Sequence, residues 1–280
     1  MRVLVTGAAG FIGFNLSKYL LEKNIKVLVI ENSLDKKLKV DLEKKFENVQ
    51  VIIPIKNLGN GAGINLGFSL VKTEFSLYLD VDTVPDKDMI NILLENTEKI
   101  KNFSILAPKE QNYNYGDDQY IKHDKNKNCH KMKFITGCAL LFNMESLNKT
   151  GYFDENIFLY YEEHDLYYRC LKLDLNIYLI DEAKYIHRGT SSTNPSYNHK
   201  IYLNRNWHYC WSKFYYFKKN YGYFYGIKKT IPNFLRALRK YIFYKITGNK
   251  KNSSLHMAEL QGLMSSYFLR KSSRRPQINT

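Results

Sequence analysis

Apolar and polar positions divide the chain into blocks that predict strands and helices in turn. Short runs rich in Val, Ile and Leu are typical of strands buried on both faces. Longer stretches, in which apolar residues recur every three or four positions, are typical of amphipathic helices. The strand-like runs are 2–5, 26–30, 49–55, 75–79, 104–107, 133–142 and 176–180, and the helical stretches between them are 16–23, 35–46, 68–72 and 86–99. This order predicts an α/β protein with a mixed, mostly parallel sheet.

The pattern changes after residue 198, where long basic and aromatic helices are expected. Apolar residues keep helical spacing from Ile227 to Ile242, with Lys and Arg around them. The last 80 residues hold 16 Lys and Arg against one acid, Glu259, so the formal charge of +15 belongs to this part alone. Such a helix suits an anionic membrane surface. The alternative is a helix packed on the rest of the protein with a solvated basic face.

Composition narrows the class of protein further. A chain of 280 residues with 44% hydrophobic and 25% charged residues can bury a large core. The four cysteines are far apart, which favours a reduced, cytoplasmic compartment over a zinc site or a disulfide framework. We expect no signal peptide and no membrane-spanning segment. Nucleic acid is not expected as a partner, because no recognised nucleic-acid module accompanies the charge.

Two aspartates, Asp80 and Asp82, end the apolar run at 75–79. The C-terminal ends of strands are where open α/β sheets bind ligands, and side chains two residues apart in an extended segment point the same way. Paired carboxylates, with water and substrate phosphates, commonly hold Mg²⁺ or Mn²⁺. The pair is therefore a candidate diphosphate site, unless it only ends the strand and caps the next helix.

A glycine-rich turn, residues 6–13, follows the first strand, and Glu31 follows the second. The spacing suits a dinucleotide, with a tight turn for the pyrophosphate and a carboxylate for a ribose hydroxyl. Residues 1–32 resemble the N-terminus of extended short-chain dehydrogenases such as nucleotide-sugar epimerases. An NAD-dependent epimerase-like or dehydratase-like oxidoreductase is therefore one interpretation.

A second glycine-rich segment, residues 57–67, precedes the strand at 75–79. Glycines let backbone amides approach a phosphate or ribose, and Asn57 and Asn65 offer both donors and acceptors. The alternative is a strand-to-helix turn that binds no ligand.

These motifs together resemble those of inverting family 2 glycosyltransferases with the A-type fold, particularly the rhamnosyltransferase-like branch, over residues 26–220. The resemblance implies a nucleotide site and a divalent-metal site. The implied nucleotide-binding and donor-binding residues are Glu31, Asn57, Gly59, Asn65, Asp80 and Gly137. The implied metal ligands are Asp80, Asp82 and His187.

Acids crowd the segment from Glu162 to Asp165. Inverting transfer needs one carboxylate to take the proton of the acceptor hydroxyl, and neighbouring acids raise one another's pKa toward neutral pH. The resembled family has Glu-Asp-x-Asp here with the second acid as base, which implies that Glu163 is the base. Glu162 stands beside it, and Asp165 would orient a substrate or Arg169. Alternatively, the acids only form a first helical turn favoured by the helix dipole.

We therefore expect a Rossmann-like A-type glycosyltransferase domain over residues 1–197, a basic, aromatic helical extension over 198–270, and a disordered tail over 271–280. The expected activity is Mg²⁺- or Mn²⁺-dependent inverting transfer of a hexosyl or rhamnosyl group. The donor would be a UDP-, dTDP- or GDP-sugar, and the acceptor a hydroxyl of a glycan or lipid-linked glycan in cell-surface polysaccharide synthesis. The expected location is the inner face of the cell membrane. The alternatives are the oxidoreductase and an inactive nucleotide-sugar-binding protein.

Overall fold

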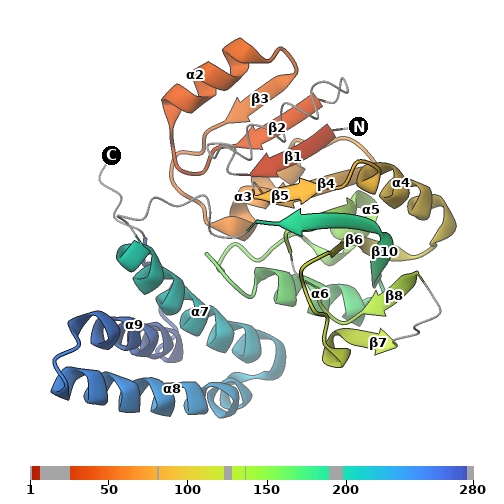
Figure 1. Ribbon diagram of the computed structural model, residues 1–280. Coiled ribbons are helices and arrows are strands. Elements are labelled where there is room, and N and C mark those ends of the chain that lie inside the picture. The colour runs from red at the N-terminus through yellow and green to blue at the C-terminus, as the bar shows by residue number, and fades with distance from the viewer. Residues whose placement is uncertain are drawn as a thin grey trace. The chain divides into compact units, whose positions relative to one another are not determined.

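The structure, a computed structural model, describes residues 2–6, 26–80, 82–122, 128–135, 137–188 and 198–275 (Figure 1). The chain forms two compact units. Unit 1 comprises Met1–Phe153 and Leu166–Ser192, and unit 2 comprises Asp154–Asp165 and Thr193–Thr280. The division falls within helix α6 (Glu162–Lys172).

Unit 1 is built on one mixed sheet with the strand order β3-β2-β1-β4-β9-β6-β10-β8-β7. Strands β1 to β4 pair in parallel, β9 runs antiparallel between β4 and β6, and β10 pairs in parallel with β6 and antiparallel with β5. The expected mixed α/β fold is confirmed. The strands are β1 (Arg2–Thr6), β2 (Lys26–Ile30), β3 (Val49–Ile52), β4 (Phe75–Asp80), β5 (Thr83–Pro85), β6 (Phe103–Glu110), β7 (Tyr120–Lys122), β8 (Cys129–Met132), β9 (Ala139–Asn143) and β10 (Asn176–His187).

Helices pack on both faces of this sheet, which buries β4 on both sides. Tyr78 belongs to one core layer, and Leu77 and Leu79 belong to the other. Helices α3 (Asn60–Ser69) and α5 (Met144–Thr150) contribute to the Tyr78 layer, together with the unit 1 part of α6. Helices α2 (Lys36–Lys45) and α4 (Met89–Lys99) contribute to the other layer. A short 3₁₀ helix, η1 (Asp117–Gln119), leads into β7.

Two elements of unit 1 differ from the sequence prediction. The glycine-rich segment itself forms α3, although a turn and a later helix at 68–72 were expected. A Cβ atom on Gly63 would lie 3.3 Å from Asn32 Nδ2, so the missing side chain lets this helix lie close to the end of β2. Residues 120–122 and 129–132, which fall outside the predicted strand-like runs, form β7 and β8, because Tyr120 and Met132 pair in register and are both buried in the core.

Unit 2 contains α7 (Asn198–Tyr221), α8 (Tyr223–Ile246) and α9 (Lys250–Tyr267). Its core includes Trp207 and Trp211 of α7 packed with Ala258 of α9. A Cβ atom on Gly262 would lie 2.3 Å from Trp207 O, so glycine allows α9 to cross α7 closely. None of the helices among the described residues is both long and apolar enough to cross a membrane.

The chain after α9 was expected to be disordered from residue 271, yet its first part packs on α7. Ser272 is buried and its hydroxyl lies 3.1 Å from Nδ1 of His208. Nε2 of the same ring lies 2.9 Å from Arg274 O. These contacts order residues 271–275, and residues 276–280 lie outside the described part of the chain.

Candidate functional site

The carboxyl edge of the parallel strands brings Asp80, Asp82 and His187 together. Asp80 ends β4, Asp82 follows two residues later, and His187 ends β10. Strand β5 pairs antiparallel with β10, with Thr83 opposite His187, and this register places the imidazole beside Asp82. His187 Nε2 lies 3.1 Å from Asp82 Oδ1. Three residues from two separate parts of the chain therefore converge, and their role as metal ligands stays a prediction.

Asp80 lies in a polar but largely enclosed position. The pKa of its carboxyl is raised to about 6, chiefly by burial and also by the neighbouring Asp82, whereas the Tyr78 hydroxyl and His187 act to lower it. The Tyr78 hydroxyl donates to Asp80 Oδ1, and the Asp80 amide donates to Cys138 O at 2.8 Å. A carboxyl at such a position favours a cation beside it, because a positive charge would keep it ionised.

The donor atoms fit a divalent cation. Asp80, Cys138 and His187 each place one ligand atom within 4.8 Å of the other two. That is close to the roughly 4 Å that separates opposite ligands around an octahedral Mg²⁺. The carboxylates suit Mg²⁺ or Mn²⁺, and the imidazole suits a transition metal.

Sequence reasoning missed two residues around this cluster. Cys138, just before β9, is brought beside Asp80 because Leu79 and Ala139 are paired across the sheet. Glu110 ends β6, and its Oε1 lies 4.0 Å from His187 Nδ1. This distance is too long for a hydrogen bond, so the buried carboxylate only adds negative charge beside the second ring nitrogen. The only local signal for Glu110 was an acid at the end of a strand-like run, so neither contact was readable from the sequence.

Glu31 lies at the same carboxyl edge, just after β2. Its side chain is buried, and its Oε1 accepts hydrogen bonds from the amide and the hydroxyl of Ser33. Its Oε2 is buried and has no hydrogen-bond partner among the described residues. A buried carboxylate oxygen without a partner is costly, which favours a ligand hydroxyl or amide at this position.

The segment predicted to hold the nucleotide is tied to the end of β2 by Asn32. The Asn32 carboxamide donates to Gly59 O at 2.7 Å and accepts from the Leu58 amide at 2.8 Å. Asn57 Oδ1 accepts from the Gly59 amide at 2.9 Å. Gly59 begins α3 at a φ of 88°, a left-handed conformation that favours glycine, and supplies no side-chain cap. The residue before α3 therefore caps none of the first amides of this helix.

Asn65 and Gly137 occupy different surroundings within unit 1. The Asn65 carboxamide is buried, donates to Phe153 O at 2.9 Å and accepts from the Phe153 amide at 3.0 Å. Both ends of the amide are thus used to hold the chain after α5. Gly137 is half-buried just before Cys138. The nucleotide roles of Asn65 and Gly137 remain predictions. The glycine-rich turn at 7–13 lies outside the described residues.

The predicted catalytic acids form the first turn of α6. Glu162 and Asp165 are buried and Glu163 is half-buried. The residues just before them, Tyr160 and Tyr161, have φ values of 66° and 70°. Bulky residues rarely adopt this left-handed conformation, and it costs about 1 to 3 kcal/mol each. Strain of this kind is typical of functional turns.

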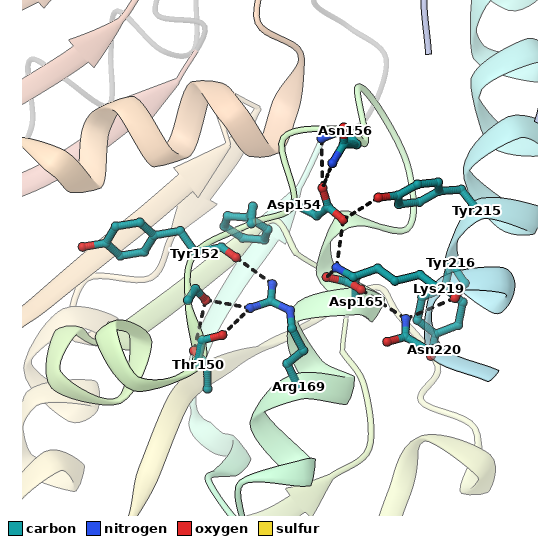
Figure 2. Close-up of polar contacts among 12 residues, drawn as sticks. Thr150, Tyr152, Asp154, Asn156, Asp165, Arg169, Tyr215, Tyr216, Lys219 and Asn220 are labelled. Carbon is teal, nitrogen blue, oxygen red and sulfur yellow. Dashed lines mark hydrogen bonds and ion pairs between the residues drawn. The ribbon is translucent and has the colours of Figure 1, made fainter. Parts of the chain in front are cut away.

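An ion-pair network around the buried Asp165 holds this turn within unit 2, and Figure 2 shows it. Lys219 Nζ lies 2.8 Å from Asp154 Oδ2 and 2.8 Å from Asp165 Oδ2. Asn220 donates to Asp165 Oδ1 at 3.1 Å, and the Tyr215 hydroxyl lies 3.0 Å from Asp154 Oδ2. The role predicted for Asp165, orienting a substrate or Arg169, stays a prediction. The Arg169 guanidinium donates to the carbonyls of Thr150, Gly151 and Tyr152.

The fold is that of a Rossmann-like A-type domain with a polar cluster at the carboxyl edge of its sheet. The chain belongs to glycosyl transferase family 2, whose family model matches residues 16–164.

Individual proteins resemble this chain in sequence or in fold. A stretch of 110 residues is 36% identical to the uncharacterised protein MJ1055 of Methanocaldococcus jannaschii, covering 38% of this chain and 30% of that protein. The structure resembles the mannosyltransferase PcManGT of Pyrobaculum calidifontis, solved with GDP-Man and Mn²⁺, at a TM-score of 0.57 and 9% identity, over 96% of this chain and 87% of that one. It also resembles residues 1–349 of S. aureus TarS, solved with UDP-GlcNAc, at a TM-score of 0.51 and 12% identity, over 96% and 92%.

A third solved structure, GalNAc-T7 with UDP, GalNAc and Mn²⁺, matches 75% of this chain at a TM-score of 0.51 and 12% identity. The match spans half of that protein's chain. At these identities the solved structures show the shared fold alone.

Proposed function

We propose that this chain is a metal-dependent inverting glycosyltransferase. It transfers a hexosyl or rhamnosyl group from a UDP-, dTDP- or GDP-sugar to a hydroxyl of a glycan or lipid-linked glycan. The observation that carries the proposal is the convergence of Asp80, Asp82 and His187 at the carboxyl edge of the sheet, with Glu31 at the same edge. PcManGT and TarS, of the same fold, were solved with GDP-Man and UDP-GlcNAc, donors of the class proposed here.

The residues of unit 1 bind the donor in this proposal. Asp80, Asp82 and His187 hold Mn²⁺ or Mg²⁺, which would stabilise the charge of the departing nucleoside diphosphate. Glu31 accepts a hydrogen bond from the nucleoside through its buried Oε2. The amides at the start of α3, beside the Asn57 turn, donate to the bound donor.

Glu163 acts on the acceptor. Its carboxylate takes the proton of the acceptor hydroxyl while that oxygen bonds to the anomeric carbon and the bond from this carbon to the diphosphate oxygen breaks. Attack on the side opposite the leaving group inverts the anomeric centre. Glu162 and Asp165 are buried in the same helical turn.

The test is release of nucleoside diphosphate from a panel of UDP-, dTDP- and GDP-sugars, with Mn²⁺ or with EDTA. We expect release from one donor in Mn²⁺ and its loss in EDTA. Glu163→Gln should lower the rate by about 10² to 10⁴, the usual contribution of a general base. Glu98→Gln, at an exposed position of α4, is the matched control and should leave the rate unchanged. Release that ignores EDTA, or that survives Glu163→Gln, would contradict the proposal.

We also propose that unit 2 docks on an anionic membrane through α8. Phe224, Leu235 and Ile246 are 85%, 58% and 81% exposed, and with Ile231 and Ile242 they form one stripe along the helix. Exposed Lys228 and Arg239 lie on the same helix. An apolar stripe with basic neighbours is the pattern that binds at an anionic lipid surface.

Vesicle co-sedimentation tests the membrane proposal. We expect binding to phosphatidylglycerol vesicles but not to phosphatidylcholine vesicles, and loss of binding in Leu235→Glu. Leu173→Glu, at a comparably exposed leucine of unit 1, should not affect it. Equal loss in both variants would mean that the stripe is not the docking surface.

A further inference from the structure

A separate cavity of about 240 Å³ lies entirely within unit 2. It is lined by α7, by the chain leaving α9, and by residues 155–158. Its aromatic wall includes Phe158, Trp211 and Tyr215, and the Trp211 and Tyr215 rings stack with centroids 4.9 Å apart. The function proposed above gives this cavity no role.

The charges lining the cavity are strongly unbalanced. Four cations, Lys218, Arg270, Lys271 and Arg275, face one acid, Glu155. Among the described residues, none of these four cations is within ion-pair distance of a carboxylate. Neighbouring Lys219, by contrast, pairs with two aspartates. Like charges gathered around a cavity raise the local concentration of anions.

Arg275 is held in place to bind an anion. Its guanidinium carbon lies 4.0 Å from the centre of the Phe158 ring. Its Nη1 donates to Ser272 O at 2.7 Å and to Arg274 O at 2.8 Å. Nε and Nη2 donate to none of the described residues, and this edge of a guanidinium binds two oxygens of a phosphate at once.

The chain reaches the cavity through a strained turn. Leu269 has a φ of 56°, and α9 ends there with hydrogen bonds from the Leu269 amide to Ser266 O and from the Arg270 amide to Ser265 O. Glycine is usual at this position of a helix end, and leucine costs about 1 to 2 kcal/mol. The Trp211 indole donates to Arg270 O at 3.0 Å, which holds the turn against α7. The turn places Arg270 and Lys271 at the cavity.

We propose that this cavity binds the phosphate of a phosphate ester, carried by a lipid or by a phosphorylated glycan. Arg275 supplies the two-donor edge, the other cations supply charge, and Phe158 and Tyr215 flank the carbon atoms of the ester. The inference goes beyond the proposed transfer reaction and does not rest on it.

Isothermal titration calorimetry of the full chain, in low salt and EDTA, tests the proposal with two probes. Glycerol 3-phosphate represents a soluble phosphate ester, and dihexanoyl phosphatidic acid represents a lipid. We expect saturable binding of at least one probe. Binding of the lipid alone assigns the cavity to a lipid headgroup, whereas binding of both assigns it to phosphate esters in general. EDTA removes any metal, so failure of the transfer proposal would not change this result.

Substitutions of the cavity residues test where the probes bind. Arg275→Gln and Lys218→Gln should each weaken it about tenfold or more. Lys251→Gln, which removes one exposed charge from α9 outside the cavity, should leave it unchanged. The indole N–H signal of Trp211 should shift in an NMR titration, while that of Trp207 should not. Binding of neither probe, or equal weakening in Lys251→Gln, would overturn the proposal.

Discussion

Two consecutive tyrosines hold the backbone in a strained conformation just before the acids of α6. Tyr161 packs against His164, Tyr209 and Tyr216, with ring centroids between 5.0 and 5.7 Å apart. This aromatic packing compensates for the left-handed φ of Tyr161. The strain and its compensation therefore lie in the same residue.

Replacing Tyr161 either by alanine or by glycine separates the loss of aromatic packing from the relief of backbone strain. Tyr161→Ala loses the packing and keeps the strain, whereas Tyr161→Gly loses the packing and relieves the strain. We expect the glycine variant to be more stable than the alanine variant by about 1 kcal/mol, the reverse of the usual order. Urea unfolding measures the difference. An alanine variant that is the more stable of the two would show that the turn is not strained.

Lys219 is the cation between Asp154 and Asp165, and its loss would leave buried carboxylates behind. Burial acts to raise the pKa of Asp154, but the hydrogen bonds from Lys219 and Asn156 lower it below its usual value. Asp165 is fully buried.

We predict that Lys219→Met destabilises unit 2 by about 3 kcal/mol, because a buried pair that loses one partner leaves an uncompensated charge. Lys219→Arg, which keeps the charge, should cost less. Urea unfolding provides the measurement. Lys218→Met is the matched control, because Lys218 forms no ion pair with a described residue. An equal loss of stability in Lys218→Met and Lys219→Met would show that the ion pairs of Lys219 do not stabilise unit 2.

At the scale of elements, α7 carries a titratable group that makes unit 2 sensitive to acid. His208 is fully buried, its ring stacks on Phe158, and Nε2 lies within hydrogen-bond distance of a carbonyl that can only accept. Nε2 therefore carries the proton, and Nδ1 accepts from Ser272. Burial lowers the pKa of His208 to about 4, and the charges of Arg275 and Arg274 add to this, while the Arg274 carbonyl opposes it.

The sign of the pH dependence follows from this lowered pKa. Between pH 6.5 and about 4 the unfolded chain binds a proton at His208 and the folded chain does not, so stability falls as the pH falls. The loss should approach about 3 kcal/mol. Urea unfolding, monitored by the fluorescence of Trp207 and Trp211, measures the stability of unit 2. In His208→Gln, stability should not show this decrease between pH 6.5 and about 4. An unchanged profile in His208→Gln would contradict the assignment.

The elements most readable from the sequence were those with buried apolar runs. Strand β2 spans Lys26–Ile30 as predicted, and β4 ends at Asp80 as predicted, because each strand is buried on both faces and stops where polar residues begin. Helix α3 was placed too late, because glycine has low helix propensity and only tertiary packing against β2 explains a helix there.

For the whole molecule, the sequence predicted where strands end, but it did not predict which distant residues the fold brings beside those ends. The convergence of Asp80, Asp82 and His187 followed from the family resemblance. The insertion of β9 between β4 and β6, which brings Cys138 to Asp80, depends on pairing between residues 35 to 68 positions apart in sequence. Local patterns carry no record of such pairing, so Cys138 and Glu110 became visible only in the fold.

We propose that Asp80, Asp82 and His187 form a metal-dependent nucleotide-sugar site. Thermal unfolding with UDP, dTDP, GDP or NAD⁺, each with and without Mn²⁺, tests it most directly. A ligand at 100 times its dissociation constant stabilises the folded state by about 2.7 kcal/mol. Asp82→Asn provides the test variant, and Asp88→Asn, at an exposed position before α4, provides the matched control.

We predict that one nucleoside diphosphate raises the unfolding temperature, and only when Mn²⁺ is present. This rise should occur in the wild type and in Asp88→Asn but not in Asp82→Asn. Stabilisation by NAD⁺ alone, independent of Mn²⁺ and of Asp82, would contradict it and favour an oxidoreductase site at the glycine-rich N-terminal turn.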